Sequence, residues 1–365
     1  MFRNWILKFG VMAGMLFGLP ALGVILNGMP VDRYLEFPPE TQYVAHAPFA
    51  WTVFSSYGIL IVLSISPFLW RGFRAWRNIR RHSDRSGCFP WWGWIGILTG
   101  LASWILAWTR FPWFKDFQPH TFTPLWLSYI VVVNAISFRR DKQCMMLDRP
   151  AFFLSLFPLS AAFWWSFEYL NRFVQNWHYV GVRFDAWEYF VYATLSFSTV
   201  LPAVLGTREW VGGAPWVQNG FKCFTPIRFK RPRLIALGVL LLAGAGLAWI
   251  GVWPDGLFPL LWISPLLILT AVQVFLKEPH VLDSVRSGDW RSVISSAAAA
   301  LFCGFFWEMW NYWSLARWEY AVPYVQKFLI FEMPVLGYAG YLPFGLECAA
   351  VGMLLETDFR KGLSI

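Results

Sequence analysis

The sequence predicts an all-α polytopic integral membrane protein of about ten transmembrane helices, in which two N-terminal spans precede a tandem duplication of a four-helix unit. Three observations lead to this fold. Hydrophobic residues make up 57% of the 365 residues and charged residues only 14%, too little polar material to cover a soluble globule. Apolar runs long enough to cross a membrane recur along the chain. Two of these runs carry the same pattern of polar residues.

The predicted spans are separated by short polar segments. Their boundaries are residues 5–26, 49–70, 91–108, 122–138, 151–170, 186–206, 234–253, 256–276, 293–313 and 331–355. The first run follows Arg3 and Lys8, which is also how a signal peptide begins. Because this run is longer than the apolar core of such a peptide and a second span follows it soon after, we interpret it as a helix.

The net charge of +9 is carried mainly by loops on one side of the predicted helices. With the N-terminus inside, the inner loops are residues 71–85, 139–143, 207–233 and 277–291, and the outer segments are 27–42, 110–120 and those at or after Asn171, Asp255 and Asn311. Since most cationic excess is in the inner loops, both termini are predicted to be cytoplasmic. We expect an integral protein of a bacterial inner membrane, with membrane lipids and no nucleic acid as partners. Segment 207–233 would lie on the anionic membrane surface.

Two aromatic segments share one pattern of polar residues. Residues 163–179 read FWWSFEYLNRFVQNWHY, and residues 305–320 read FFWEMWNYWSLARWEY. At an offset of about 140 residues, the matching residues are Glu168 and Glu308, Asn171 and Asn311, Trp177 and Trp318, and Tyr179 and Tyr320. Further matches in the same order, such as AWTRFPW from residue 107 and AWIGVWP from residue 248, indicate a duplicated unit of about four helices.

The duplication predicts three regions of the chain. Residues 1–86 hold the two N-terminal spans and a basic loop, residues 87–232 the first four-helix unit, and residues 233–365 the second. An even number of spans gives both units the same orientation, so an axis along the membrane normal would relate them. Proteins built in this way commonly place a binding site between the units.

The paired carboxylates are the first candidates for a functional site. In both units the Glu and the Asn are three residues apart, and they therefore share one helix face near its outer end. A carboxylate there meets the negative end of the helix dipole, so helix capping does not explain it. Either a neighbouring group, namely the Asn, a Trp N–H, Arg183 or Arg317, satisfies a buried carboxyl group, or the carboxyl group is functional.

Three further acidic residues are candidates. Glu188 and Glu332 are expected near the start of the next helix in each unit, where they either stabilise the helix N-terminus or belong to the site. Glu347 is expected inside the last span, about 22 Å along the helix from Glu332. Pro334, Pro343 and three nearby glycines predict a kink in this span, which either forms a wall of the site or allows close helix packing.

Aromatic residues surround these acids. Trp and Tyr favour the membrane interface, which accounts for most of the 25 tryptophans, but the clusters beside Glu168 and Glu308 also suit the wall of an apolar pocket. The predicted catalytic residues are Glu168, Asn171, Glu308, Asn311 and Glu332. The predicted substrate-binding residues are Trp165, Trp177, Tyr179, Glu188, Trp307, Trp318, Tyr320, Tyr338, Tyr341 and Glu347.

Several other kinds of site lack support in the sequence. The five cysteines form no C-x-x-C pair and the five histidines are scattered over loops, so we expect no disulfide framework, no metal site and no cofactor. The chain also lacks a P-loop, a G-x-S-x-G signature and an H-E-x-x-H signature.

One short motif resembles a known family. The motif is a W-x-Y element followed, after about a dozen residues, by E-x-P, formed here by Trp318, Tyr320, Glu332 and Pro334. It resembles the lycopene-cyclase domain of integral membrane carotenoid enzymes, in which small duplicated helical units carry a Trp-x-aromatic element and a Pro-x-Glu-Glu helix start. This chain lacks the adjacent acidic pair, its Pro follows the Glu, and its predicted unit has four spans instead of three. The resemblance implies acid-catalysed chemistry on a polyene, with Glu308 or Glu332 as the proton donor.

The sequence leaves three interpretations of function open. A carboxyl group in apolar and aromatic surroundings favours its neutral form and can act as a general acid, so the paired acids could act on a lipid or isoprenoid substrate in an aromatic-lined pocket. Alternatively, the same acids bind a cation or proton in a transporter or channel, and the kinked last span gates the path. A third interpretation is a non-catalytic subunit of a membrane complex, whose aromatic surface packs against partner helices.

Overall fold

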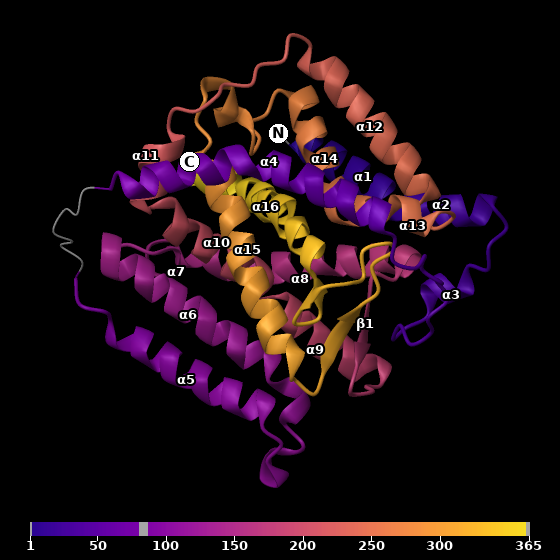
Figure 1. The fold of residues 1–365 in the computed structure, drawn as a ribbon, viewed down its shortest axis with the longest axis horizontal. Coiled ribbons are helices and arrows are strands. Elements are labelled where there is room, and N and C mark those ends of the chain that lie inside the picture. Colours follow the sequence, from indigo (N-terminus) through magenta and orange to yellow (C-terminus); the bar gives the residue numbers. More distant parts are fainter. Residues whose placement is uncertain (1, 80–86, 363–365) are drawn as a thin grey trace.

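The computed structural model describes residues 2–79 and 87–362 and is mainly helical (Figure 1). Residues 80–86, which include the second part of the predicted inner loop 71–85, lie outside the described residues. Within the described part of the chain, nine helical segments are long and apolar enough to cross a membrane. This confirms the predicted class of polytopic α-helical membrane protein.

The elements follow one another in two series. The first series is α1 (Phe2–Ala13), the π-helical turn η1 (Gly14–Gly18), α2 (Leu19–Leu26), α3 (Asp32–Leu35), α4 (Trp51–Arg77), α5 (Trp91–Trp108), η2 (Pro112–Phe114), η3 (Gln118–His120), α6 (Phe122–Asp141), α7 (Met145–Asp148), α8 (Pro150–Val174) and β1 (Trp177–Val180). The second series is α9 (Ala186–Phe197), α10 (Val200–Gly212), α11 (Pro215–Phe221), α12 (Pro232–Trp249), α13 (Pro254–Leu257), α14 (Pro259–Leu276), η4 (Asp283–Ser287), α15 (Arg291–Tyr312), β2 (Arg317–Tyr320), β3 (Leu329–Ile330), β4 (Met333–Pro334), η5 (Val335–Gly340) and α16 (Tyr341–Gly362).

Most predicted spans recur with shifted ends. Nine of them overlap the nine apolar segments, and the remaining one, residues 91–108, forms α5 with the predicted bounds. Helix α5, in which five of the 18 residues are tryptophan, is not among the nine apolar segments. The predicted span 186–206 is divided into α9 and α10 by a break at residues 198–199. The predicted loop 207–233 begins too early, because α10 continues to Gly212 and α11 follows it.

The predicted last span, residues 331–355, is wrong at its start. Residues 329–334 form the β3–β4 hairpin and residues 335–340 a 3-10 helix, so that the α-helix begins only at Tyr341. Phe331 has a left-handed φ of 56° and Pro334 an extended ψ of 139°, neither of which continues an α-helix. Glu332 therefore lies in a hairpin turn and not at a helix N-terminus. Its predicted position on the same helix as Glu347 is also wrong.

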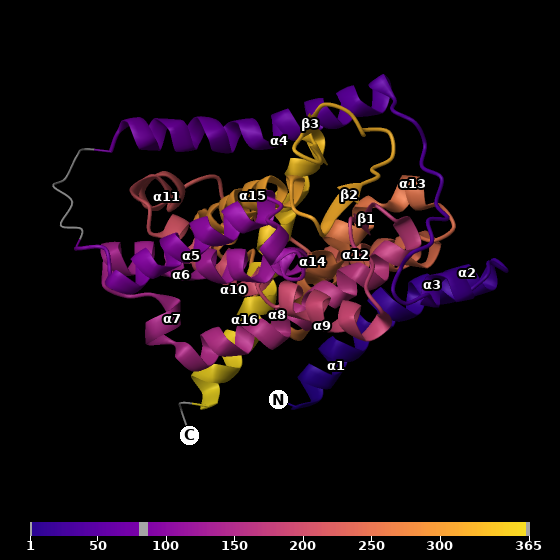
Figure 2. The ribbon, with the colours of Figure 1, turned by 90° about the horizontal axis from the view of Figure 1, so that it is seen from below.

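The long helices pack in a continuous row. Helix α5 packs on α6, α6 on α10, α10 on α15, α15 on α16, α16 on α14, and α14 on α12. In Figure 1, α5 and α6 run side by side along a diagonal at the lower left, and α12 lies at the opposite edge. Figure 2 shows α4 along one side of the molecule, where it contacts α11 and η5. No residue of α4 is buried, as expected for a helix that faces lipid.

The loops gather at two opposite ends of the helices. At one end, the Phe224 amide donates to the Gly288 carbonyl at 2.8 Å and the Gly87 amide to the Arg139 carbonyl at 3.0 Å. All four residues lie in or next to predicted inner loops, and we call this the inner end. At the opposite, outer end, hydrogen bonds join residues 43–47 to residues 175 and 255.

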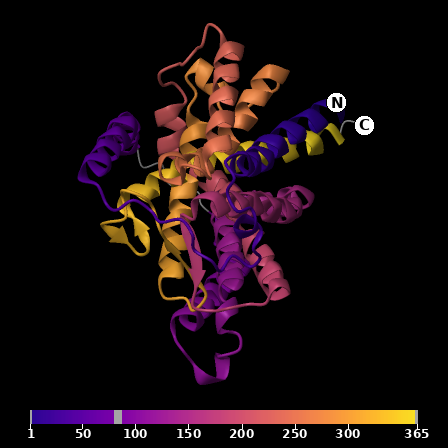
Figure 3. The same cartoon turned by 90° about the vertical axis from the view of Figure 1, so that its right-hand side faces the viewer.

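The first and last helices begin and end near each other. Figures 2 and 3 show the start of α1 and the end of α16 on the same side of the molecule. The Lys8 ammonium also forms a 2.7 Å ion pair with Glu278 of the predicted inner loop 277–291. This agrees with termini on one side of the membrane, while their cytoplasmic location stays a prediction.

A small residue allows the central helices α15 and α16 to approach closely. A Cβ atom built on Gly345 would lie 2.0 Å from the Ser296 carbonyl oxygen. No side chain fits at that distance, so the contact requires glycine, as is common where membrane helices pack tightly. The predicted alternative of close helix packing therefore describes this part of the last span.

Candidate functional site

Glu168 is held by three donors at the outer end of α8. Its Oε1 atom accepts hydrogen bonds from Trp164 Nε1 at 3.0 Å, Trp177 Nε1 at 3.1 Å and the Tyr179 hydroxyl at 2.6 Å. Only 4% of the residue is exposed. Of the neighbours that the sequence suggested, the Trp N–H groups satisfy this carboxyl group, and Asn171 and Arg183 do not.

Glu308 occupies a similar position on α15. Its Oε1 atom accepts from the Tyr320 hydroxyl at 2.8 Å and from the Tyr341 hydroxyl at 2.6 Å. Trp318 extends the network, because its Nε1 donates to the Tyr320 oxygen at 2.9 Å. Glu308 is 0% exposed, and its Oε2 atom is buried without a hydrogen-bond partner among the described residues. The Oε2 atom of Glu308 can therefore still accept hydrogen bonds.

The tyrosines of both strands remain protonated donors. Burial, reinforced by the adjacent carboxylates, raises the pKa of Tyr179 and of Tyr320 well above the ordinary value. Tyr179 is 36% exposed and borders a cavity, while its hydroxyl is turned toward Glu168. Both phenols therefore donate to a carboxyl group behind them.

Asn171 and Asn311 bind backbone in equivalent ways. The Asn171 amide nitrogen donates to the Trp177 carbonyl at 2.8 Å, and its oxygen accepts from the Asn176 amide at 2.8 Å. The Asn311 amide nitrogen donates to the Trp318 carbonyl at 2.7 Å, and its oxygen accepts from the Trp318 amide at 2.9 Å. Each Asn thus fixes the turn between a helix and the strand that follows it.

Asn311→Ala is expected to lower the free energy of unfolding by about 1–2 kcal/mol, because the Trp318 backbone loses both partners. Asn171→Ala should have a similar effect, whereas Asn78→Ala, at an exposed position after α4, should have almost none. Thermal unfolding in detergent gives the stability, and limited proteolysis of residues 313–330 reports whether β2 has detached. Equal behaviour of the Asn311 and Asn78 variants would contradict this role.

Strands β1 and β2 join the two segments across the site. They pair antiparallel, with Trp177 opposite Tyr320 and Tyr179 opposite Trp318. Residues two apart on a strand face the same side, so the two W-x-Y elements present four rings to one side of the ribbon. This pairing of residues far apart in the sequence is absent from the sequence-based prediction, which placed only loops there.

The four rings border a cavity of about 310 Å³ at the outer end of the molecule. Its wall is mainly aromatic. The side chains that form it come from α8, α9, α14, α15 and α16 and from both strands. Figure 1 shows β1 beside α9. The predicted residues that line it are Trp177, Tyr179, Trp307, Trp318, Tyr320 and Tyr341. The aromatic residues that line it without having been predicted include Trp164, Phe184, Tyr189, Tyr192, Phe197, Trp262 and Phe344.

The two carboxylates lie behind this wall and not in it. Every donor that binds Glu168 or Glu308 is itself a lining residue, whereas neither carboxylate lines the cavity. Neither acid borders the cavity directly, and their predicted role in catalysis stays a prediction. The carboxylates orient tyrosine and tryptophan side chains, and the hydroxyls of Tyr320 and Tyr341 connect Glu308 to the cavity.

Charged residues lie at the entrance. The residues that border the cavity there are Glu40 and Arg183, which are both exposed, and His178 and Arg317. Arg317 donates to Glu319 at 2.8 Å, so this predicted partner of Glu308 binds a different carboxylate. The cavity thus combines an apolar aromatic interior with a polar entrance.

Three predicted site residues lie outside the cavity for local reasons. Trp165 donates to the Thr194 hydroxyl at 3.0 Å and packs between helices. Glu188 is exposed and forms a capping box with Asp185 at the start of α9, so its helix-stabilising interpretation is the correct one. Tyr338 donates to the Ile330 carbonyl at 3.1 Å.

The remaining two acids also lie elsewhere. Glu332 sits in the β3–β4 turn, where burial, reinforced by Glu319, raises its carboxyl pKa. Glu347 accepts a hydrogen bond from the Leu266 amide at 3.1 Å. Pro265 interrupts α14 just before Leu266, and a proline in a helix leaves nearby backbone groups without their usual partners. Glu347 therefore compensates the proline in the neighbouring helix.

The sequence indicates only weakly the cavity-lining residues that were not predicted. Trp164 belongs to the same Trp-rich segment as Trp165, but only helix phase decides which of the two faces the cavity. Trp262 and Phe344 come from α14 and α16, where the sequence shows only apolar spans. Their contribution follows from helix packing.

No protein-family model, no curated protein and no solved structure matches the chain. The resemblance to the lycopene-cyclase domain thus rests on the short motif alone, and Glu332 of that motif does not line the cavity. Within residues 2–79 and 87–362, no group of three or more His, Cys, Asp or Glu side chains is arranged to hold a metal ion.

Proposed function

We propose that the protein is an integral membrane enzyme that binds a lipid or isoprenoid molecule in the aromatic cavity at its outer end. The observation that carries this proposal is the wall of the cavity, in which aromatic side chains from both predicted units surround about 310 Å³. Pockets of this size with apolar walls and a few convergent polar groups are typical of small-molecule sites. The polar entrance would leave a headgroup in water while an apolar chain enters.

Tyrosine hydroxyls supply the polar groups inside the cavity. Tyr320 and Tyr341 line it and are hydrogen-bonded to Glu308, and Tyr179 lines it and is hydrogen-bonded to Glu168. In an acid-catalysed step, Glu308 would be neutral and its hydrogen bond with Tyr341 would be reversed, with the carboxyl group donating to the tyrosine oxygen. The Tyr341 hydroxyl would then give its proton to the substrate as it takes the proton of Glu308, which is left as a carboxylate. The faces of Trp177 and Trp307 could stabilise positive charge that develops on the substrate.

The tandem duplication is part of this proposal. Helix pairs that correspond in the two predicted units both pack together, since α5 contacts α6 as α12 contacts α14, and α6 contacts α10 as α14 contacts α16. The antiparallel pairing of the two W-x-Y elements is what a two-fold axis between equivalent segments would produce. A cavity bordered by both units is the arrangement expected for a duplicated membrane protein.

Transport and a non-catalytic subunit role have no comparable support. Transport would require Glu308 and Glu347 to act along one path, but Glu308 binds Tyr320 and Tyr341 while Glu347 binds the Leu266 amide. A pure packing role for the aromatic residues does not explain why the inward-facing rings enclose a cavity. We therefore advance the enzyme alone.

Ala193→Trp is expected to abolish retention of the bound molecule. Ala193 lines the cavity from α9, so an indole there would occupy much of the available volume. Native mass spectrometry of protein purified gently from its own membrane, followed by lipid extraction, should show an apolar molecule retained by the wild type and lost from this variant. Leu195→Trp, at a 50%-exposed position on the same helix, is the matched control and should retain it.

The outcomes separate binding from chemistry. If only bulk phospholipid is recovered from the wild type and from both variants, the binding site proposed here is wrong. If a specific molecule is retained, its turnover is then compared in Tyr341→Phe and Glu308→Gln. Loss of turnover with retained binding in both variants would support the proton relay, and unchanged turnover would contradict it.

A further inference from the structure

A second cavity lies at the inner end, away from the aromatic one. It has a volume of about 400 Å³ and is bordered by the ends of α8, α10, α15 and α16 and by residues next to η4. Its charged lining residues are Arg149, Arg208, Glu209, Asp289, Arg291 and Glu356. Nothing in the proposed function uses this cavity.

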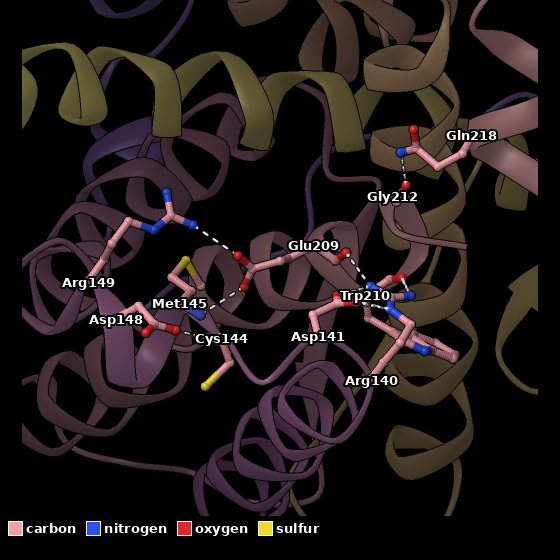
Figure 4. A network of polar contacts seen from close by, with 10 residues as sticks. All are labelled: Arg140, Asp141, Cys144, Met145, Asp148, Arg149, Glu209, Trp210, Gly212 and Gln218. Atoms are coloured by element: carbon pink, nitrogen blue, oxygen red, sulfur yellow. Dashed lines mark hydrogen bonds and ion pairs between the residues drawn. The ribbon is translucent and has the colours of Figure 1, made fainter. Parts of the chain in front are cut away.

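Two of the three arginines are paired with carboxylates. Arg149 forms ion pairs with Glu209 at 3.1 Å and with Glu356 at 3.3 Å, and Figure 4 shows Arg149 pointing toward Glu209. Arg291 forms a 2.6 Å ion pair with Asp289. The hydrogen bonds that the Arg291 side chain donates lower the pKa of the Asp289 carboxyl group. The three acids of the cavity wall are therefore already engaged by two arginines.

Arg208 is left with unused charge and hydrogen-bonding capacity. Its guanidinium is buried and donates to the Ser292 hydroxyl at 2.9 Å, but it forms no ion pair with any described residue. Its Nε atom is buried without a partner among the residues that the structure describes. Glu356 and Glu209 attract the Arg208 charge without forming an ion pair with it. A bound anion would contact the guanidinium directly and so reduce the cost of burying it.

The neighbouring groups also favour an anion. Ser292 and Ser295 border the cavity in the first turns of α15, a helix of 22 residues with the positive end of its dipole on this side. The Arg291 amide at this helix end already donates to Asp289 at 3.1 Å, so only the amides that follow it are left for an anion. The carbonyl groups at the end of α10, which would repel an anion, are covered by donors. Arg140 donates to the carbonyls of Glu209 and Trp210, and Gln218 to that of Gly212, as Figure 4 shows.

We infer that this cavity binds the phosphate group of a phospholipid headgroup or of a small phosphate ester. A phosphate offers several oxygen acceptors to the guanidinium fork of Arg208, the serine hydroxyls and the N-terminal amides of α15. Both sources carry the same recognised group, and they differ in whether an acyl chain must be present.

The inference is tested on the full chain purified in detergent. Inorganic phosphate and glycerol phosphate are added separately and the thermal unfolding midpoint is measured, while a parallel sample is incubated with phosphatidylglycerol vesicles, re-extracted and examined by native mass spectrometry. Arg208→Gln should weaken binding about 10- to 100-fold, as expected for the loss of a charge-assisted hydrogen bond. Ser292→Ala should weaken it less. Arg233→Gln, which removes the same charge from an exposed position, should have no effect.

Each outcome decides the inference. A midpoint shift with soluble phosphate that Arg208→Gln abolishes identifies a phosphate ester site. Retention of phosphatidylglycerol that only the Arg208 variant loses identifies a lipid headgroup site. Without phosphate, Arg208→Gln should be about as stable as the wild type, since no carboxylate forms an ion pair with the charge that it removes. Wild-type protein that responds to neither probe, or a variant that responds as the wild type does, overturns the inference.

Discussion

Glu308→Ala is expected to lower the free energy of unfolding by about 3–5 kcal/mol. The substitution leaves the Tyr320 and Tyr341 hydroxyls without their acceptor at a position where Glu308 is 0% exposed, and it also creates a cavity. Because the two hydroxyls are no longer oriented, retention of the molecule in the aromatic cavity should fall as well. Reversible unfolding in a denaturing detergent measures the first effect and native mass spectrometry the second.

Two comparisons make this expectation specific. Glu308→Gln keeps an acceptor oxygen for both hydroxyls and should cost clearly less than the alanine variant. Combining Glu308→Gln with Tyr341→Phe in a double-mutant cycle should give a coupling energy of about 1 kcal/mol or more, because the two side chains are in contact. Glu40→Ala, at the exposed entrance, controls for the loss of a carboxylate. Additive effects of the Glu308 and Tyr341 changes would argue against the network.

Gly345→Ala is expected to cost about 3 kcal/mol, at the upper end of the usual range for overpacking. The new Cβ atom would lie 2.0 Å from the Ser296 carbonyl oxygen, and a backbone atom in the second turn of α15 cannot move aside without moving the helix. Helix α15 carries Glu308 and α16 carries Tyr341, so their separation would also weaken the hydrogen bond between them. Thermal unfolding and ligand retention should therefore decrease together.

Gly340→Ala provides the matched control for this prediction. It is the same change five residues earlier, at a position where an added Cβ atom meets nothing within 4 Å. Its stability should equal or slightly exceed that of the wild type, since alanine restricts the unfolded chain more than glycine does. If both variants unfolded at the same temperature, the close approach of α15 and α16 would not be the reason for glycine at position 345.

The sequence was sufficient for the membrane class and for most spans, because the length and composition of an apolar run are local properties. Helix α5, which is rich in tryptophan, was predicted with its observed bounds. The start of the last helix could not be predicted from composition. Residues 331–340 contain a single charged residue, Glu332, and run directly into the apolar helix, so composition does not mark where the helix begins. The left-handed Phe331 and the extended Pro334 place these residues in a hairpin and a 3-10 turn.

The candidate site was predictable only as a set of residues. The repeated motif drew attention to Trp177, Tyr179, Trp318 and Tyr320, and all four line the cavity. Their relation to the carboxylates was not predictable, because hydrogen bonds depend on where the chain returns after each helix. The Asn residues, predicted as catalytic, bind the returning backbone, and the tyrosine and tryptophan side chains occupy the positions beside Glu168 and Glu308.

The sequence by itself determined that this protein is a bundle of membrane-spanning helices with acids set among aromatic residues, since burial of apolar runs in a bilayer needs no tertiary information. Only the tertiary structure decided which of these residues face one another. The antiparallel pairing of β1 with β2 encloses the aromatic cavity and leaves both carboxylates behind its wall. Packing of α10 against α15 brings Arg208 to Ser292. Such contacts join residues distant in the chain, and their geometry depends on helix phase and packing, which local composition does not specify.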